Sequence, residues 1–221
     1  MPDVHSRFPG TYRDVHGTED IEILNDGRTL RVVVRGVTLT GEDFDDLKPV
    51  EGTEAAALAR LPVNLGWLWD CELRCRIPLR ISGPEGAFTA PLETRLILGD
   101  PTASGQPDEE VVQLRLVLEG QEYLSPGVSG WYEDELNDLF GKLPEAFQPR
   151  LCFTCAFSDY NPGGHGLFGG MACFRDNKAE YLTVRSKGDM WRVWPTLTEY
   201  VQETHLCPEF QQRPPGTGYR G

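Results

Sequence analysis

The amino-acid sequence predicts a mainly β (α+β) protein, built around an antiparallel, β-sandwich-like sheet with one amphipathic helix. Three observations lead to this fold class. Several segments alternate apolar and polar residues with the period of a half-buried strand. Clusters of Gly, Pro, Asn and Asp separate these segments, as turns between antiparallel strands require. Residues 131–143 instead place apolar side chains at helical spacing.

The first predicted element is a β-hairpin. Residues 21–24 and 29–39 are apolar-rich segments on either side of Asn25-Asp26-Gly27. The Asp-Gly pair accepts the positive backbone angles of a tight turn, so the two segments are expected to pair. Residues 51–61 are rich in alanine, which predicts one short helix before the next strand.

Residues 69–81 form the most regular predicted strand, because their apolar and charged side chains alternate almost without interruption. Cys71 and Cys75 share the apolar parity of this segment. On a strand, four steps of ~3.3 Å separate the two sulfurs by ~13 Å, which is too far for one metal ion. We therefore predict that both cysteines belong to the core.

Two further strands are predicted at 92–98 and 111–119, joined by a loop of turn-forming residues. The amphipathic helix at 131–143 follows. It carries acidic residues in its first turn and is ended by Pro144. Shorter strands are expected at 168–175 and 181–184, and a second short helix at 195–202.

The length of 221 residues suffices to bury a core without disulfides or metals. Hydrophobic residues make up 39% and charged residues 25%, values typical of a globular protein. We expect a β-rich domain at 1–148, with the helix near its end. A cysteine-rich β region at 149–221 is expected to pack on it, so that the two form one compact unit.

A formal net charge of -13 opposes binding to nucleic acids and to anionic membranes. It is compatible with a basic protein partner. The N-terminal residues lack the charged start and apolar run of a secretion signal, and no stretch reaches ~18 apolar residues. The sequence therefore predicts a cytoplasmic protein, in which thiols stay reduced and cysteines are core residues or metal ligands.

Four cysteines in the last third of the chain predict a metal site. Cys152-Phe-Thr-Cys155 is a C-x2-C pair, whose tight turn lets two thiolates converge on one ion. Cys173 follows at a spacing found in zinc ribbons, and Cys207 can supply a fourth sulfur. We predict that Cys152, Cys155, Cys173 and Cys207 hold a structural zinc ion in a C-terminal zinc-knuckle-like region.

Several alternatives to this zinc site stay open. His165 or His205 could replace one sulfur, or the thiols could be buried without a metal. The C-x2-C pair could also act in redox chemistry, although no helix start follows it to lower a thiol pKa. Four thiolates fill the coordination shell of zinc and leave no place for an activated water. The predicted site therefore holds structure and performs no chemistry.

Two enzymatic interpretations compete with the structural one. Ser158, Asp159 and His165 could form a hydrolase triad, but no G-x-S-x-G elbow surrounds the serine. A catalytic zinc with His165 as a ligand could use Glu203 or Asp159 as a base. The glycine-rich residues 163–170 lack the lysine of a phosphate-binding loop and are predicted as a hairpin loop. The sequence favours a protein that is not an enzyme.

The C-terminal third resembles a family of uncharacterised bacterial proteins. The motifs that carry the resemblance are Cys152-Phe-Thr-Cys-Ala-Phe-Ser-Asp-Tyr160, Phe168-Gly, Cys173-Phe-Arg175, Gln202-Glu-Thr-His-Leu-Cys207 and Gly218-Tyr-Arg-Gly221. The resemblance implies a bacterial, cytoplasmic module with clustered cysteines and no established activity.

The profile of a small, acidic chain without a recognisable catalytic motif favours a protein-binding role, with immunity against a secreted toxin as one hypothesis. A zinc-dependent hydrolase and an accessory scaffold protein of a biosynthetic or secretion locus are the alternatives. The C-terminal tail is expected to dock on the domain through Tyr219 and Arg220, because an aromatic ring and a guanidinium offer packing and hydrogen bonds.

Overall fold

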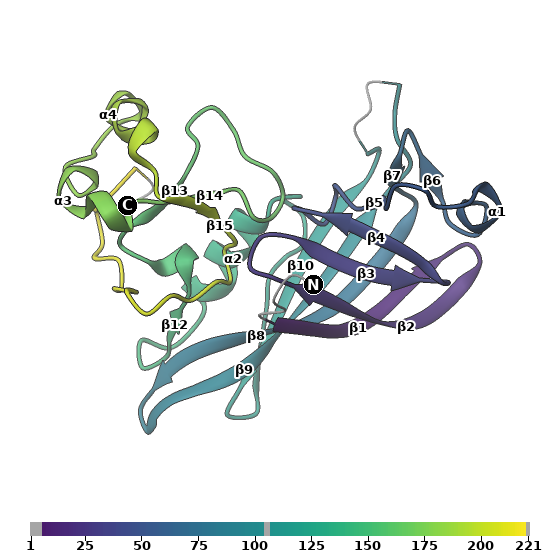
Figure 1. The fold of residues 1–221 in the computed structure, drawn as a ribbon. Helices are drawn as coiled ribbons and strands as arrows, with labels where there is room; N and C mark the ends of the chain where they lie inside the picture. Colours follow the sequence, from purple (N-terminus) through teal and green to yellow (C-terminus); the bar gives the residue numbers. More distant parts are fainter. Residues whose placement is uncertain (1–5, 104–106, 220–221) are drawn as a thin grey trace. The chain divides into compact units, whose positions relative to one another are not determined.

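The computed structural model describes residues 6–103 and 107–219 (Figure 1). Within these ranges no helix has the length and apolar character needed to cross a membrane. The strands are β1 (Ser6–Asp14), β2 (Gly17–Asn25), β3 (Leu30–Val34), β4 (Val37–Gly41), β5 (Lys48–Pro49), β6 (Val63–Asn64), β7 (Trp67–Leu68), β8 (Cys71–Gly83), β9 (Gly86–Leu98), β10 (Glu110–Leu118), β11 (Gln121–Leu124), β12 (Gln148–Arg150), β13 (Ser158–Tyr160), β14 (Met171–Cys173) and β15 (Glu199–Val201). The helices are α1 (Ala55–Leu58), α2 (Tyr132–Gly141), α3 (Lys178–Tyr181) and α4 (Lys187–Val193), with 3-10 turns η1 (Cys152–Thr154), η2 (Arg175–Asn177) and η3 (Trp194–Thr196).

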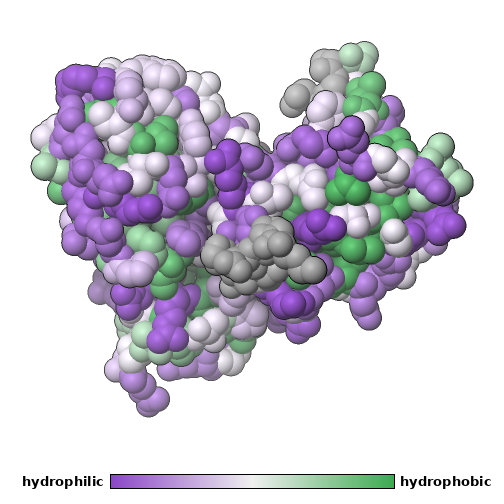
Figure 2. Space-filling view, viewed as in Figure 1, coloured by the Kyte–Doolittle hydropathy of each residue, from purple (hydrophilic) through white to green (hydrophobic). Residues whose placement is uncertain are grey.

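The chain divides into two compact units. Unit 1 comprises residues 1–78 and 90–143, and unit 2 comprises residues 79–89 and 144–221. The tip of the hairpin formed by β8 and β9 therefore belongs to unit 2, although the rest of both strands belongs to unit 1. On the face drawn in Figure 2, hydrophilic residues predominate and apolar residues form separate patches, in keeping with a mean hydropathy of -0.38.

Unit 1 is organised by one large sheet with the strand order β11-β10-β9-β8-β1-β2-β3-β4-β5. Strand β1 is central to this order, because it pairs antiparallel with both β2 and β8. Gly10 of β1 lies opposite Ile21 on one side and Cys75 on the other. A side chain at Gly10 would collide with the carbonyl oxygen of Arg74, at 1.8 Å from an ideal Cβ position. Only glycine allows the backbones to approach so closely.

Strand β8 shows how the sequence pattern produces the core. Its buried and exposed side chains alternate from Cys71 to Ile81, as the sequence predicts. Cys71 and Cys75 are buried on the apolar face, and burial raises the pKa of the Cys75 thiol to about 12. Both thiols therefore stay neutral at physiological pH and act as small core residues. The predicted mainly β, antiparallel fold is confirmed.

The predicted strand at 29–39 is interrupted in the structure. Arg35 and Gly36 have φ angles of 48° and 79° and form the two-residue turn between β3 and β4. A positive φ suits glycine and is strained for arginine, and tertiary contacts hold Arg35 in place. Its guanidinium makes two bonds to the buried carboxylate of Asp14, at 2.5 and 2.6 Å, and lies over the ring of Tyr12.

The helices of unit 1 follow the predictions with different lengths. Helix α2 confirms the amphipathic helix expected at 131–143. Its buried face includes Tyr132, Leu136 and Leu139, which recur at helical spacing. Helix α1 is a single turn within the alanine-rich segment 51–61, and none of its residues is buried. Helix propensity without an apolar face to bury supports only this short element.

Unit 2 contains a small antiparallel sheet in the order β13-β14-β15. Helices α3 and α4 lie beside it (Figure 1), and their apolar residues share a core with those of the sheet. Tyr181 of α3 stacks on Phe174, with the ring centroids 4.8 Å apart, while Met190 and Val193 come from α4. The apolar faces of the small sheet and of the helices thus pack together, although these short elements have little stability of their own.

Two sequence predictions in unit 2 are wrong. Residues 181–184 are expected as a strand, but Tyr181 ends α3 and a turn follows it, with Tyr181 and Val184 both buried. Residues 195–202, expected as a helix, form the end of η3 and then β15. The helix of this region is α4, which begins after Ser186, whose hydroxyl accepts a hydrogen bond from the Asp189 amide at 3.1 Å.

A half-buried carboxylate at the start of β10 gives a prediction about pH. Burial raises the pKa of Glu110 to about 7, and the nearby charge of Asp45 adds to the effect. A carboxyl group whose folded pKa is raised stabilises the fold at low pH, and this contribution is lost as the pH rises from about 4.5 to about 7. We expect Glu110→Gln to leave stability unchanged at pH 4 and to raise it at pH 8, by on the order of 1 kcal/mol.

Urea unfolding at the two pH values measures this difference. Glu109→Gln is the matched control, because it removes the same charge from the exposed neighbouring position. A stability gain that is equal at both pH values, or equal for both variants, would contradict the assignment.

Candidate metal centre

The C-x2-C pair lies in a tight turn at the start of the C-terminal region of unit 2. Cys152 begins the 3-10 turn η1 and Cys155 follows it, and the amide of Cys155 donates to the carbonyl of Cys152 at 3.0 Å. The turn follows β12 directly, and Thr154 ties it to that strand by donating to the carbonyl of Pro149 at 2.7 Å. Both cysteines are buried.

The chain near Cys207 runs alongside this turn. The amide of Cys152 donates to the carbonyl of His205 at 2.6 Å, and the amide of Ala156 donates to the carbonyl of Gln211 at 2.8 Å. Between these two contacts Cys207 occupies a second turn, closed by a hydrogen bond from the amide of Phe210 to its carbonyl at 3.2 Å. Backbone pairing therefore brings Cys207, 52 positions after Cys155, to the C-x2-C turn.

Cys173 is the last residue of β14 and is held there on both sides. It pairs with Ser158 of β13 and with Glu199 of β15. The backbone amide of Arg175 donates to its sulfur, and the guanidinium of Arg175 lies 3.9 Å from the same atom. Arg175 is also paired with Glu199, which fixes the position of its side chain.

The four predicted thiols interact electrostatically. Burial raises the pKa of Cys152, and the thiols of Cys155, Cys173 and Cys207 each raise it further. Burial also raises the pKa of Cys173, on which Cys155 and Cys207 act in the same direction and Arg175 acts in the opposite one. The four sequence-predicted ligands therefore lie close enough to influence one another's ionisation.

The four thiols do not have the arrangement of the ligands of one metal ion. Among residues 6–103 and 107–219, no group of three or more His, Cys, Asp or Glu side chains is arranged to hold a metal ion. The chemistry of the donors nevertheless suits zinc, because they are sulfur atoms, three of them on buried cysteines, with an amide and two cationic side chains nearby. The second cation is Lys178, which interacts with Cys155 and Cys207 and is paired with Glu209 at 2.6 Å.

The comparisons with known proteins concern mainly the first two thirds of the chain. Residues 6–158 match the model of a family of unknown function, DUF6304. The chain belongs to this family. No curated protein and no solved structure matches it. The match to DUF6304 includes Cys152 and Cys155 and ends before Cys173 and Cys207. Membership of an uncharacterised family is confirmed, whereas the bacterial source and the C-terminal motifs stay predictions.

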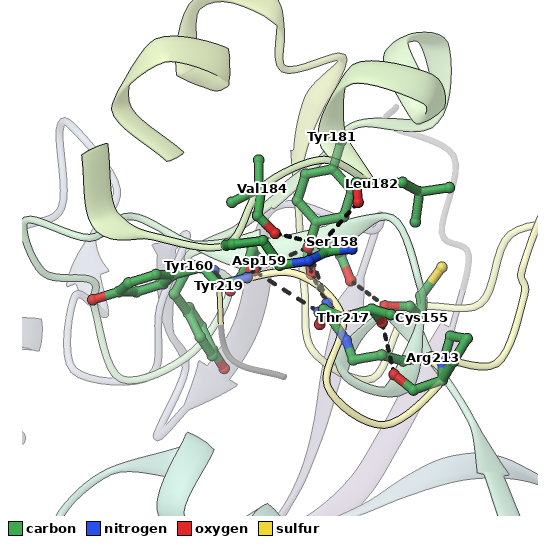
Figure 3. Close-up of polar contacts among 12 residues, drawn as sticks. Cys155, Ser158, Asp159, Tyr160, Tyr181, Leu182, Val184, Arg213, Thr217 and Tyr219 are labelled. Atoms are coloured by element: carbon green, nitrogen blue, oxygen red, sulfur yellow. Dashed lines mark hydrogen bonds and ion pairs between the residues drawn. The ribbon is translucent and has the colours of Figure 1, made fainter. Parts of the chain in front are cut away.

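The residues of the hydrolase hypothesis have structural partners in this member of the DUF6304 family. Ser158 is 1% exposed, and its hydroxyl donates to the carbonyl of Cys152. The carboxylate of Asp159 accepts hydrogen bonds from the hydroxyl of Tyr181 and from the amide of Tyr219, each at 2.9 Å (Figure 3). The ring of His165 stacks on Tyr160, with the centroids 3.9 Å apart. These contacts are those of a packed core. They leave the Ser158 hydroxyl no exposed position from which to attack a substrate.

Glu203, a candidate base for a catalytic zinc, is fully buried. Burial raises the pKa of its carboxyl group. One carboxylate oxygen accepts from the hydroxyl of Tyr160 at 2.9 Å and the other from the amide of Gly169 at 2.7 Å. Glu203 thus anchors the glycine-rich segment 163–170, predicted as a hairpin loop, to the segment between β15 and Cys207.

Arg213 is a residue that the sequence interpretation missed. Its guanidinium donates to the carbonyl of Ser158, to the carbonyl of Thr217 at 2.8 Å and to the hydroxyl of Tyr181 at 3.2 Å (Figure 3). With Asp159 it holds residues 213–219 against β13. The expected docking of the tail occurs through these contacts and through the Tyr219 amide, and Arg220 lies outside the described residues. The Arg-Pro-Pro-Gly composition gave no signal for such a role.

Proposed function

We propose that the protein is a protein-binding module whose unit 2 is held by a structural zinc ion. The ligands are Cys152, Cys155, Cys173 and Cys207. The observation that carries the zinc assignment is the backbone pairing of residues 205–211, which include Cys207, with the C-x2-C turn, while Cys173 pairs with Ser158 just after that turn. Four thiolates leave two negative charges on a zinc ion, and the side chains of Arg175 and Lys178 offset them.

Zinc binding requires the sulfurs to close around the ion. Zinc–sulfur bonds of about 2.3 Å place the sulfurs of a tetrahedral site about 3.8 Å apart. Closure of the site therefore requires the turns at Cys152 and Cys207 to tighten around the ion. Because binding occurs only in the folded chain, its free energy adds to the stability of unit 2.

The binding role is supported by a loop of unit 1 that joins β11 to α2. Glu135, in the first turn of α2, is 1% exposed, and its carboxylate accepts hydrogen bonds from three consecutive backbone amides. They are those of Gly127 at 2.7 Å, Val128 at 3.1 Å and Ser129 at 3.0 Å. The hydroxyl of Ser129 donates to the same carboxylate at 2.7 Å. A single buried side chain thus fixes the loop in one conformation.

The fixed loop presents apolar side chains to solvent. Val128 is 83% exposed and Trp131 is 46% exposed. Exposed apolar groups on a rigid segment are favourable contacts for a partner, because little conformational entropy is lost when they bind. Tryptophan is also among the residues that contribute most to binding energy at protein interfaces. Residues 127–131 are therefore the proposed anchor loop.

The binding role is tested by partner capture with surface variants. Wild-type protein is immobilised and incubated with lysate of the cells that produce it, beside a Val128→Ser/Trp131→Ala double variant. The matched control is Val15→Ser, which removes another valine that is 78% exposed in a turn. We expect wild type and the control to retain the same protein, and the double variant to bind it at least about tenfold more weakly.

Failure of wild type to retain any protein would contradict the binding role, and equal retention by all three would contradict the anchor loop. The catalytic-zinc hypothesis has less support, because the carboxylates of Asp159 and Glu203 are buried and hydrogen-bonded. The immunity and scaffold roles stay predictions.

A further inference from the structure

Unit 1 contains a hollow on the polar side of its sheet. Its volume is about 390 Å³, and it extends over β1, β2, β8, β9, β10 and β11. Its size lies within the range of ligand-binding pockets in proteins. The charged residues that line it are Arg74, Arg76, Arg95, Arg115, Asp20 and Glu93. Four arginines face two carboxylates here, although the whole chain carries a net charge of -13.

Three of the four arginines pair with carboxylates, of which Glu72 and Glu122 do not line the hollow. Glu72 is shared between Arg74 and Arg95, so one negative charge serves two guanidinium groups. Arg115 pairs with Glu93 and with Glu122, each at 2.7 Å. This ion-pair network holds the side chains in place, because shared partners restrict their rotamers.

Two groups of the hollow retain unused hydrogen-bonding capacity. Among the residues that the structure describes, the exposed guanidinium of Arg76 makes no hydrogen bond and no ion pair. Within the same residues, the Nε atom of Arg95 is buried without a hydrogen-bond partner. A guanidinium presents its donors in a planar fork that matches a carboxylate. Because the Arg95 Nε atom is buried, the exposed guanidinium of Arg76 is the donor in the hollow that is open to an anionic ligand.

The hollow borders the anchor loop. Leu124, which is 43% exposed, lines the hollow and lies three residues before Gly127. Gly127 packs on the side chain of Gln113, another lining residue, with an ideal Cβ position 3.1 Å from the Cβ of Gln113. Apolar contact surface and unpaired arginine donors are thus continuous on unit 1.

We propose that the hollow binds an acidic segment of the protein partner, of which one carboxylate pairs with Arg76 while an adjacent apolar side chain packs on Leu124. This inference rests on the proposed protein-binding function and names the chemistry of its partner. The net charge alone predicts a basic partner, whereas the unpaired Arg76 in this hollow favours an acidic segment. A long polyanion such as a nucleic acid is disfavoured, because the rest of the acidic surface repels it.

The test uses fluorescence anisotropy with a labelled peptide of glutamate and leucine, and with its lysine–leucine counterpart. We expect the intact protein to bind the acidic peptide more tightly than the basic one, with an affinity that falls as salt is added. Arg76→Glu should weaken binding about tenfold, and Leu124→Ser several-fold. Both positions are exposed, so neither variant should unfold the protein.

Arg31→Glu is the matched control. Arg31 is exposed on β3, lies outside the hollow and changes the net charge by the same amount. Equal weakening by Arg31→Glu and Arg76→Glu would overturn the proposal, and so would a preference for the basic peptide or stronger competition by a single-stranded oligonucleotide. Loss of partner capture in Val128→Ser/Trp131→Ala but not in Arg76→Glu would overturn the hollow alone and leave the binding function standing.

Discussion

Protein purified without a chelator is expected to contain one zinc ion per chain, and its removal is expected to unfold unit 2. The structural zinc ions of small domains are bound with about 10 kcal/mol or more, and this free energy is available only to the folded chain. Cys155→Ser and Cys173→Ser should each lose the metal and lower the stability of unit 2 by more than about 3 kcal/mol. Metal analysis measures the first effect. Near-ultraviolet circular dichroism measures the second, because Trp194 packs edge-on against Phe174 in this unit.

Cys75→Ala is the control for these variants, because it removes a buried thiol of β8 that is not one of the four proposed ligands. It should be destabilised as a core residue and still carry one zinc ion. Burial raises the pKa of Cys152 and Cys173, so protons compete with zinc for their sulfurs, and occupancy should fall as the pH is lowered from 8 to 5. Metal-free wild type, or equal metal in all variants, would end the zinc assignment.

Replacing Glu135 is expected to cost both stability and partner binding. Glu135→Ala leaves the amides of Gly127, Val128 and Ser129 without their acceptor, and each unsatisfied buried donor costs about 1–3 kcal/mol. Since water can reach part of the released loop, we expect a total loss of about 3–5 kcal/mol. Chemical denaturation gives this loss directly. Hydrogen exchange at the three amides should speed up, because they are protected only through the carboxylate.

Asp134→Ala is the matched control, because it removes an exposed carboxylate from the same helical turn. It should cost less than about 1 kcal/mol. Burial alone would raise the pKa of Glu135, but hydrogen bonds from Ser125, from Ser129 and from the loop amides lower it. A carboxyl group whose pKa is lowered in the folded state stabilises the fold when the pH is above the ordinary pKa of the group. This stabilisation is lost as the pH falls through the lowered pKa of the folded state. The stability gap between wild type and Glu135→Gln should therefore shrink in acid, and a constant gap would contradict the role of the charge.

The strands of the large sheet could be predicted wherever one face is buried. Alternation from Cys71 to Ile81 identified β8 and removed two cysteines from the candidate ligands. The turn at Arg35 could not be predicted, because arginine there depends on the distant Asp14 for its conformation. Short helices of unit 2 were also missed, although Ser186-x-x-Asp189 is a recognisable capping pattern.

The candidate ligands could be predicted from cysteine spacing, but their surroundings could not. Nothing in the sequence indicates that Arg175 would lie beside Cys173, or that residues 205–211 would run along the C-x2-C turn. The roles of Glu135 and Arg213 also depend on backbone groups of distant or irregular segments. Hydrogen bonds to such groups leave no pattern in a single sequence.

The long hairpin of β8 and β9 means that no single cut of the chain yields two intact units. Residues 79–89 pair with β12 through Ser82, Ile81 and Arg80. This pairing can form only after β12, more than sixty residues later in the chain, has been synthesised. During synthesis, Leu79 and Ile81 would be exposed until that segment emerges from the ribosome. A chain truncated after residue 143 would keep them exposed, and should aggregate even though it retains nearly all of the large sheet.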